Sequence, residues 1–181
     1  RPDGQAIDTN MLGFTVSPHE ECATEEAIRQ IEHHGGSSTV MTLGPVEAEE
    51  QLRTALSVGV DSAVLLTTDG ADWDPMATAA ALTATIRDIE AADGPFDLIL
   101  FGNESADSGG YQVGVRVARA LARPIVSGIK HVAVAEGVVT ARRDTPAGSE
   151  LYRLDLPAVL GIKEGINLPR CPTLKGRLGA K

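Results

Sequence analysis

Apolar residues recur at helical spacing in four segments of the chain, and each segment carries recognisable start and stop residues. The first begins with Ser17-Pro18-His19-Glu20, where a glutamate follows the serine by three positions, the pattern of a capping box. Glycine follows three of the four segments, as it commonly ends helices. These patterns predict helices over residues 17–35, 45–59, 74–94 and 111–122.

Three short apolar runs lie between these segments, at residues 39–43, 63–67 and 97–101. They do not alternate strictly between apolar and polar residues, so we expect both of their faces to be covered, as in a parallel sheet. Helices that alternate with such strands predict an α/β fold with a doubly wound, mainly parallel, Rossmann-like sheet. Because the first predicted element is a helix, we expect a further strand upstream of residue 1, beside these three.

The pattern changes after Pro124. Residues 129–134 and 138–142 flank Glu136-Gly137, which indicates a hairpin, and apolar residues alternate again over 152–156. A last apolar run covers residues 158–162, and prolines and glycines exclude long regular elements beyond it. We therefore predict a nucleotide-binding α/β domain over residues 1–162, with an antiparallel appendage at 125–162, followed by a separate segment at 163–181.

Composition narrows the class of protein. A chain of 181 residues with 43% hydrophobic content suits one folded domain, and no apolar run approaches the roughly 20 residues of a membrane helix, so we expect no membrane insertion. The net charge of −9 disfavours nucleic-acid binding. Residues 163–181 are nevertheless basic, as either a partner surface or a solvated end. Cys22 and Cys171 lack metal-ligand spacing, and we expect both to be reduced in a cytoplasm-like compartment.

The clearest candidate site is the loop over residues 102–114. It leaves the carboxyl end of a predicted strand and enters a helix, which is where open α/β sheets bind ligands. Ser108, Gly109 and Gly110 would let backbone N–H groups approach a phosphate at the helix N-terminus. The loop is neither a Walker A motif nor a G-x-G-x-x-G motif, so a plain glycine-rich turn is the alternative. The Ser17 capping box would lie at the same sheet edge.

Other groups of reactive residues do not assemble into catalytic machinery. His33-His34 end a predicted helix, where they complement its dipole. Asp69, Asp72 and Asp74 resemble half of a calcium loop whose glycine and glutamate are misplaced. Asp107 and Glu104 could form an acid pair, but no nucleophile or histidine is close to them in sequence. The sequence therefore predicts no catalytic residue and no metal site.

The run from Lys163 to Gly176 resembles the signature of the electron transfer flavoprotein beta subunit. That family carries Asn-x-Pro-Arg, an aromatic residue, a small residue or proline, and then Ser/Thr-Leu, which align with Asn167 through Leu174. Further motifs of the family agree in order and spacing within residues 18–27, 44–59 and 102–114. The resemblance covers nearly the whole chain, and the motifs are specific in combination.

This resemblance implies a heterodimer. An alpha subunit would hold the redox-active FAD, and the beta subunit would bind AMP as a structural nucleotide. The pair would carry electrons from acyl-CoA dehydrogenases or related flavin dehydrogenases to a quinone oxidoreductase, without catalysis by the beta subunit itself. Its compartment would be the cytoplasm of a bacterium or the mitochondrial matrix of a eukaryote.

Motif alignment also assigns residues to each role. The implied AMP contacts are Ser17, Pro18, His19, Glu20, Leu43, Gly102, Asn103, Glu104, Ser105, Ala106, Asp107, Ser108, Gly109, Gly110, Tyr111, Gln112 and Val113. In the segment that would recognise dehydrogenases, Leu174 is the implied anchor, and it is accompanied by Asn167, Pro169, Arg170, Thr173 and Lys175.

The chain departs from the family pattern at several positions, and two alternatives stay open. Ser17 replaces the usual asparagine, His19 and Cys171 stand where aromatic residues are usual, and Gly179 stands where many members have lysine. One alternative is a bifurcating beta subunit with a second FAD and an NADH contact, which residues 112–114 resemble. The other is a stand-alone ATP-binding stress-type module, which would leave the motif at residues 167–175 without a role.

Overall fold

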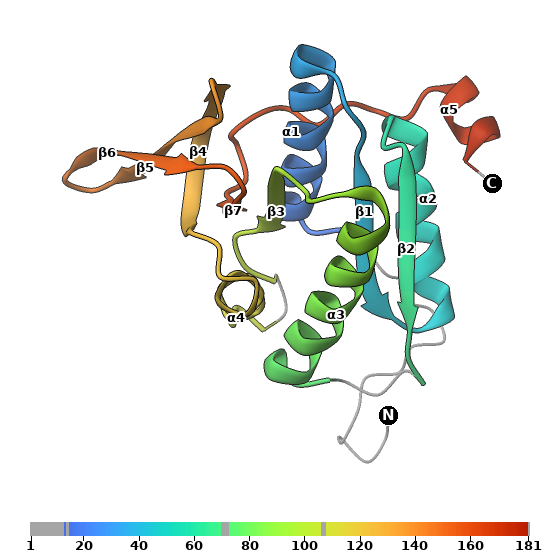
Figure 1. Cartoon of the computed structure of the whole chain (residues 1–181). Helices are drawn as coiled ribbons and strands as arrows, with labels where there is room; N and C mark the ends of the chain where they lie inside the picture. The colour runs from blue at the N-terminus through green and yellow to red at the C-terminus, as the bar shows by residue number, and fades with distance from the viewer. Residues whose placement is uncertain (1–12, 14, 70–72, 106–107, 181) are drawn as a thin grey trace, which may run out of the picture.

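The computed structural model describes residue 13 and residues 15–69, 73–105 and 108–180. Helices and strands alternate through the first part of the chain, and strands dominate the second part (Figure 1). The helical elements are α1 (Pro18–His34), η1 (Val46–Ala48), α2 (Glu49–Val58), α3 (Pro75–Asp93), α4 (Val113–Ala120) and α5 (Leu174–Gly179). The strands are β1 (Thr39–Gly44), β2 (Ser62–Thr67), β3 (Leu98–Gly102), β4 (Ile125–Ala135), β5 (Val138–Thr145), β6 (Gly148–Asp155) and β7 (Ala158–Ile162).

The predicted starts of α1 and α3 are confirmed, although their caps differ in detail, whereas α2 begins at Glu49, after η1, rather than near Pro45. Asp74 caps α3 directly, because its carboxylate accepts hydrogen bonds from the backbone N–H groups of Met76 at 2.7 Å and Ala77 at 2.9 Å. Ser17 occupies the same position before α1, but its hydroxyl donates to the Glu20 carboxylate and makes no cap bond to the backbone. The serine and glutamate of the capping box thus pair through their side chains.

Helix α4 is shorter than the 111–122 segment predicted from its apolar spacing. Tyr111 has φ of 53° and Ala122 has φ of 55°, both in the left-handed region. A non-glycine residue in that region cannot continue a right-handed helix, so α4 begins at Val113 and ends at Ala120.

The strands form two separate groups among the described residues. Strands β1 and β2 pair in parallel, and β3-β7-β4-β5-β6 form a second sheet in that order. Within this second sheet β3, β7 and β4 are parallel, whereas β4, β5 and β6 are antiparallel. The fold is therefore a mixed α/β fold with parallel elements. The single continuous parallel sheet that we predicted is interrupted between β1 and β3.

Strand β7 differs from the prediction that placed it in an antiparallel appendage. It runs parallel to both neighbours and lies between β3 and β4, and all five of its residues are buried. Its sequence, Ala-Val-Leu-Gly-Ile, has no polar face and therefore suits a strand that is covered on both sides. Antiparallel pairing is confined to the β4–β6 region. There the predicted hairpin is confirmed, with positive φ at both Glu136 and Gly137.

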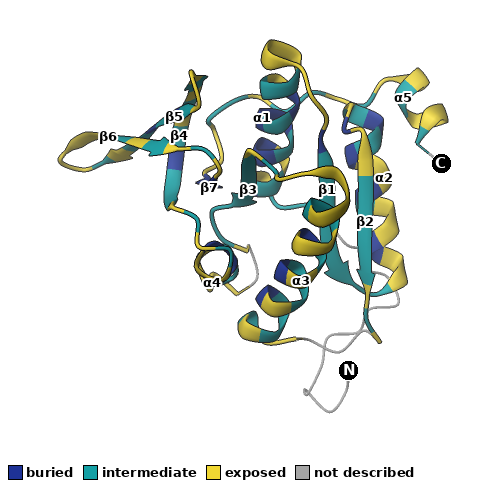
Figure 2. Cartoon of the chain, in the orientation of Figure 1, coloured by how far each residue is buried: buried dark blue, intermediate teal, exposed yellow. Residues whose placement is uncertain are grey.

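Helices cover both faces of the parallel strands. Leu98 and Leu100 of β3 pack in the cluster that contains Cys22 of α1, whereas Ile99 and Phe101 pack with Val117 of α4. This alternation follows from the two-residue period of a strand. Buried residues accordingly lie along the inner sides of α1, α3 and α4 (Figure 2). No helix in the described part of the chain is long and apolar enough to cross a membrane.

Candidate functional site

The candidate site lies where β3 ends and α1 begins. A side chain at Gly102 would meet the carboxylate of Glu20, so glycine at this position lets the loop approach the first turn of α1 with that carboxylate in place. The last residue of β3 is thus in close contact with the capping segment of α1. The sequence prediction that these two segments lie at the same edge is supported by this contact.

The loop after Gly102 is held by short-range hydrogen bonds. The Ser105 and Ser108 hydroxyls lie 2.5 Å apart, and the Gly109 N–H donates to the Ser105 carbonyl at 2.9 Å. Gly109, with φ of 55°, and Tyr111 both adopt left-handed conformations that turn the chain into α4. This turn directs the N-terminal end of α4 toward the cavity described below. Ala106 and Asp107, two of the predicted contacts, lie outside the described residues.

Glu104 connects the loop to α1. Its Oε1 lies 3.5 Å from Nε2 of His19, which is a buried residue. The His19 Nδ1 accepts a hydrogen bond of 2.9 Å from the backbone N–H of Glu164, so a neutral imidazole carries its proton on Nε2, facing Glu104. The Tyr111 hydroxyl donates to Glu104, and this hydrogen bond, aided by burial, raises the pKa of Tyr111. His19 therefore links the loop to the start of the C-terminal segment.

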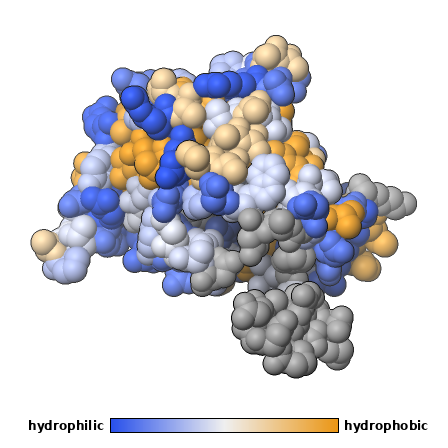
Figure 3. Space-filling view, turned by 90° about the horizontal axis from the view of Figure 1, so that it is seen from below, coloured by the Kyte–Doolittle hydropathy of each residue, from blue (hydrophilic) through white to orange (hydrophobic). Residues whose placement is uncertain are grey.

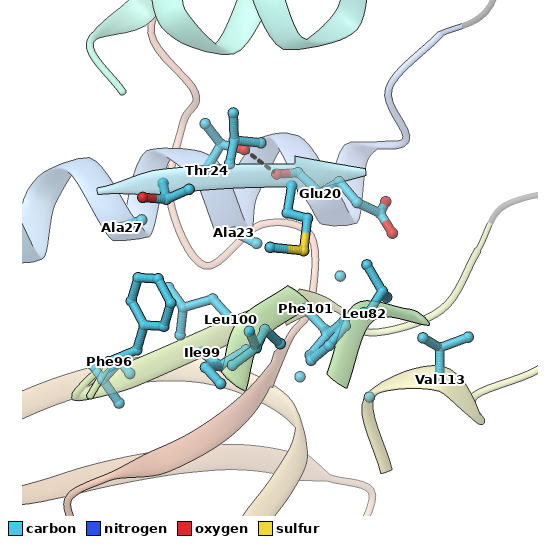
Figure 4. A pocket seen from close by; sticks show the side chains of 18 of the residues that line it. Glu20, Ala23, Thr24, Ala27, Leu82, Phe96, Ile99, Leu100, Phe101 and Val113 are labelled. Carbon is cyan, nitrogen blue, oxygen red and sulfur yellow. Dashed lines mark hydrogen bonds between the residues drawn. The ribbon is translucent and has the colours of Figure 1, made fainter. Parts of the chain in front are cut away.

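A cavity of about 670 Å³ gathers much of the predicted site (Figure 4). This volume lies in the range of small-molecule pockets. Predicted residues from three separate segments line it: Glu20, Leu43, Gly102, Asn103, Glu104, Ser105, Ser108, Gly110, Tyr111, Gln112 and Val113. The remaining described members of the predicted set are not among the lining residues: Ser17, Pro18, His19 and Gly109. His19 instead contacts the lining residue Glu104 from behind.

Several polar lining residues were missed from the sequence, and two of them come from elements that carry no predicted contact. Thr78 of α3 and Ser127 of β4 both face the cavity. Thr78 lies in an alanine-rich helix and Ser127 in an apolar strand, and neither belongs to a recognisable motif. Only the packing of distant elements brings them to the site.

The segment 163–180, which we call the tail, runs along α1 and reaches α2 (Figure 1). The Asn167 side-chain amide donates to the Cys22 carbonyl at 3.1 Å and to the Glu26 carboxylate at 3.2 Å. Further along, α5 begins at Thr173, whose hydroxyl accepts from the Gly176 N–H at 3.0 Å. Gly176 packs so closely against the Ser57 carbonyl of α2 that no side chain would fit there.

Arg170 makes the strongest contact between the tail and α1. Its Nε lies 2.8 Å from Glu25 Oε2, and its Nη1 lies 2.6 Å from Glu32 Oε1, with further bonds from Nη2 to both carboxylates. Burial opposes ionisation of Glu25, but hydrogen bonds from Arg170 and Arg29 outweigh it and lower the pKa of Glu25. The same guanidinium lowers the pKa of Glu32. Charge-assisted bonds of this forked kind fix orientation as well as position.

Other predicted tail residues face solvent. Leu168 is 85% exposed, Leu174 is 77% exposed and Leu178 is 68% exposed, and Thr173 and Lys175 are also exposed. The predicted recognition set therefore divides into two kinds of residue. Asn167 and Arg170 bind α1, whereas Leu174 and Lys175 are free to meet another molecule. Pro169 is half-buried between them.

Metal binding and disulfide formation find no support in the described residues. No group of three or more His, Cys, Asp or Glu side chains there is placed to hold a metal ion. Cys22 is a buried free thiol, and Cys171 is an exposed one.

Comparison with known proteins places this arrangement in a family. A model described as the electron transfer flavoprotein domain matches residues 6–181. The beta subunit of the electron transfer flavoprotein of Bacillus subtilis (strain 168) is 38% identical over 170 residues, which cover 93% of this chain and 64% of that protein. Its counterpart in Mycobacterium bovis (strain ATCC BAA-935 / AF2122/97) is 38% identical over 181 residues, 97% of this chain and 66% of that protein.

A relative with a different name also matches. Protein FixA of Sinorhizobium fredii (strain NBRC 101917 / NGR234) is 33% identical over 169 residues, 91% of this chain and 59% of that protein. The chain thus spans less than two thirds of the length of the Bacillus subtilis, Mycobacterium bovis and Sinorhizobium fredii relatives.

Proposed function

Because the chain belongs to the electron transfer flavoprotein family, we propose that it acts as the beta subunit of an electron-carrying heterodimer and holds AMP beside the Gly102 loop. An alpha subunit would hold the redox-active FAD. The observation that carries the nucleotide proposal is the convergence of β1, β3 and the first turn of α1 on one cavity. Ligands of open α/β sheets bind at such a carboxyl edge.

The phosphate of AMP would lie at the start of α4. The first backbone N–H groups of a helix have no partner within the helix, and the helix dipole favours an anion there. Gln112 and Val113, which open α4, and Ser108 and Gly110 all line the cavity. The turn at Gly109 and Tyr111, where φ is positive, leads into these residues, and a turn of this kind at the start of a helix suits an anion-binding site.

The cavity also contains two carboxylates, and they suit the uncharged parts of a nucleotide rather than its phosphate. Glu20 and Glu104 both line the cavity, and carboxylates only accept hydrogen bonds. They suit ribose hydroxyls or an adenine amino group and repel phosphate. One phosphate at the α4 end is compatible with that charge distribution, whereas the pyrophosphate of FAD would bring a second anionic group toward the carboxylates. We therefore propose AMP rather than a second FAD as the ligand.

The tail provides the second part of the proposed function. Leu174 and Lys175 are exposed on a helix that is attached to the body of the protein through α2 and, by way of Arg170, through α1. We assign this surface to dehydrogenase recognition, with acyl-CoA dehydrogenases and related flavin dehydrogenases as donors and a quinone oxidoreductase as acceptor. Burial of one leucine contributes about 1.5–3 kcal/mol, which suits a transient encounter. The compartment we propose is the bacterial cytoplasm, or the mitochondrial matrix in a eukaryote.

The test of the nucleotide proposal is to purify the heterodimer, denature it and weigh the released nucleotides. We expect AMP and FAD in equal amounts. Two FAD per heterodimer would instead identify a bifurcating member. A homodimer that releases ATP and carries no flavin subunit would contradict membership in an electron-carrying complex.

A variant pair connects the nucleotide to the loop. In Gly102→Val the new side chain takes the place of the Glu20 carboxylate, which lines the cavity, so AMP content should fall at least about tenfold, the effect of 1.4 kcal/mol, while FAD stays bound. Gly179→Val is the matched control, because nothing lies within 4 Å of a side chain at Gly179. Equal AMP content in both variants would refute the assignment of this loop.

A further inference from the structure

A groove of about 750 Å³ runs between the outward sides of helices α3 and α4. The two helices pack against each other and lie side by side (Figure 1). The residues of α3 that line the groove run from Met76 to Arg87, which is about 17 Å along the helix axis, or about three turns. The groove is therefore long enough to hold about three turns of another helix.

The α3 side of the groove consists largely of small side chains. Ala79, Ala80 and Ala84 all line it. The distance between the axes of two packed helices depends on the side chains at the contact, and alanine allows a close approach. A third helix can therefore lie against both α3 and α4.

Thr83 lies among these alanines and lines the groove, and only 4% of its surface is exposed. Its hydroxyl has no hydrogen-bond partner in the part of the chain that the structure describes. Buried hydroxyl groups are nearly always paired, because an unpaired one loses its bonds to water without replacement. The groove thus offers a hydrogen-bond donor that a bound molecule can satisfy.

Three arginines line the same groove, and their bonds are to neutral groups. Arg87 donates to the Ala120 carbonyl at 2.6 Å, and Arg116 donates to the side-chain oxygen of Gln112 at 2.9 Å. Within residues 15–69, 73–105 and 108–180, no carboxylate forms an ion pair with Arg87, Arg116 or Arg119. The positive charge of this groove is therefore not neutralised by a direct partner.

Arginines elsewhere in the described chain mostly pair with carboxylates. Acidic residues outnumber Lys and Arg by 25 to 16 in the sequence, so acids are available for such pairs. The charge of Arg116 reaches Asp74, but hydrogen bonds from the N–H groups of Ala77 and Met76 contribute more to the lowered pKa of Asp74. A cluster of arginines on an acidic protein, without carboxylate partners of its own, is complementary to an acidic surface on another molecule.

One end of the groove is apolar. Met76, Tyr111 and Val115 line it there, and all three are exposed. Seen from below, hydrophobic and strongly hydrophilic side chains lie next to one another on this side of the protein (Figure 3). Exposed apolar side chains with a charged rim are typical of surfaces that bind other proteins.

We propose that the groove between α3 and α4 docks an acidic helix of a partner protein. The apolar residues of that helix pack on the alanines of α3 and on Val115. Its carboxylates pair with Arg116 and Arg119, and one of them accepts a hydrogen bond from the Thr83 hydroxyl. This docking surface is separate from the tail, which lies on α1 and α2, and the inference does not rest on the proposed nucleotide or dehydrogenase.

The test uses the 181-residue chain and a synthetic helical peptide of about 15 residues, stapled on its outward face. The peptide carries leucine and alanine on one face, flanked by glutamate. We expect saturable binding that weakens with added salt, together with slower amide hydrogen exchange in α3 and α4. The control peptide has glutamine in place of every glutamate and should bind at least about tenfold more weakly. Equal binding of the two peptides, or no saturable binding, would overturn the proposal.

A pair of double variants tests the location. Arg116→Gln with Arg119→Gln should weaken binding of the glutamate peptide about fivefold or more. Arg153→Gln with Arg177→Gln removes the same charge from exposed arginines outside the groove, which also form no ion pair among the described residues. This control should leave the affinity within about twofold. Equal losses in both double variants would mean that net charge alone attracts the peptide, and the groove would be the wrong site.

Thr83→Val tests the buried hydroxyl, because valine keeps the shape of threonine and removes the donor. The Tm should stay the same or rise, since an unpaired buried group is removed, while the affinity for the glutamate peptide should fall about threefold or more. Thr85→Val, on the same helix but outside the groove, should leave the affinity unchanged. A lower Tm with unchanged affinity in Thr83→Val would make the hydroxyl structural and refute its assignment to the partner.

Two other occupants of the groove give different results. Sedimentation of the 181-residue chain alone should show no dimer that Arg116→Gln with Arg119→Gln dissociates. Such a dimer would identify a second copy of this chain as the occupant and overturn the proposal. Loss of peptide binding on addition of inorganic phosphate at constant ionic strength would identify a small-anion site instead of a helix-docking groove.

Discussion

The Gly102 loop and the tail contact the same helix, α1, in different ways. Among the described residues, the loop meets α1 at its first turn, through the pair of Glu104 with His19 and the close approach of Gly102 to Glu20. The tail follows α1 along its length, from His19 in the first turn through Cys22 and Glu26 to Glu32 near the end. The loop is therefore attached at one point, whereas the tail is attached at several.

This difference fits two kinds of binding. Residues of the loop line a cavity, where the proposed small ligand would complete their contacts. A tail fixed along a helix loses little further freedom when a partner protein binds, because most of its ordering entropy has already been lost on folding. Asn167 and Arg170 thus hold the tail on α1, whereas Leu174 is exposed, as its proposed role in partner recognition requires.

Removing Arg170 should break the attachment of the tail, and its effect on the free energy of unfolding should be the largest of the changes considered. In Arg170→Met the Glu25 carboxylate, which is 5% exposed, keeps only Arg29 as an ionic partner. We expect a loss of about 2–3 kcal/mol in the free energy of unfolding, less than for a fully buried pair because Arg170 itself is 34% exposed. Urea unfolding measures this loss, and nucleotide content should not change. Arg153→Met, at an exposed site on β6, is the control and should stay within about 0.5 kcal/mol.

Shortening Leu174 should have a smaller effect, which falls on the rate of electron transfer and not on the free energy of unfolding. Leu174→Ala should leave the free energy of unfolding within about 0.5 kcal/mol, because the side chain is 77% exposed. Electron acceptance from a dehydrogenase should slow about tenfold, since an interface leucine contributes about 1.5 kcal/mol or more when buried. Stopped-flow reduction of the heterodimer measures this rate. Leu151→Ala on β6, where the leucine is 70% exposed, is the matched control, and equal rates in the two variants would refute the anchor.

Sequence patterns predicted most helices and strands because residues at their ends, such as caps, prolines and glycines, mark where they start and stop. Asp74-Pro75 and Gly94 bound α3 where the sequence predicts it, and the turn at Glu136-Gly137 is correctly identified. The position of β7 was not predictable in this way. A run such as Ala-Val-Leu-Gly-Ile indicates a buried strand but does not specify its neighbours, and β7 joins β3 and β4 across a long separation in sequence.

The candidate site was predictable in part for a similar reason. The Gly102 loop and the start of α1 carry motifs, so their residues could be proposed from spacing alone. Thr78 and Ser127 reach the cavity only through packing, and no local pattern identifies them. In the tail, the Asn-x-Pro-Arg motif identifies the residues but does not indicate which way their side chains point. Which side chains bind α1 and which face solvent depends on Glu25 and Glu32, more than a hundred residues earlier in the chain.

Acidification should weaken the tail attachment, and its effect should be smaller than those of Arg170→Met and Leu174→Ala. The pKa of Glu25 is lowered in the folded protein, because hydrogen bonds from Arg170 and Arg29 outweigh the opposing effect of burial. A depressed pKa stabilises the folded state above the unfolded pKa of about 4.3, and this contribution is lost as pH falls through the folded value. Protonated Glu25 still accepts hydrogen bonds from Arg170, so the loss is smaller than in Arg170→Met.

The pH effect can be separated from general acid unfolding by comparing two proteins. The difference in unfolding free energy between the original chain and Arg170→Met should be constant from neutral pH down to about 4.3 and should shrink below it. The Arg153→Met difference should show no such dependence, because Arg153 makes no ion pair recorded among the described residues. If the Arg170→Met difference instead persists unchanged to about pH 3, packing and neutral hydrogen bonds hold the tail, and the charge of Glu25 contributes nothing measurable.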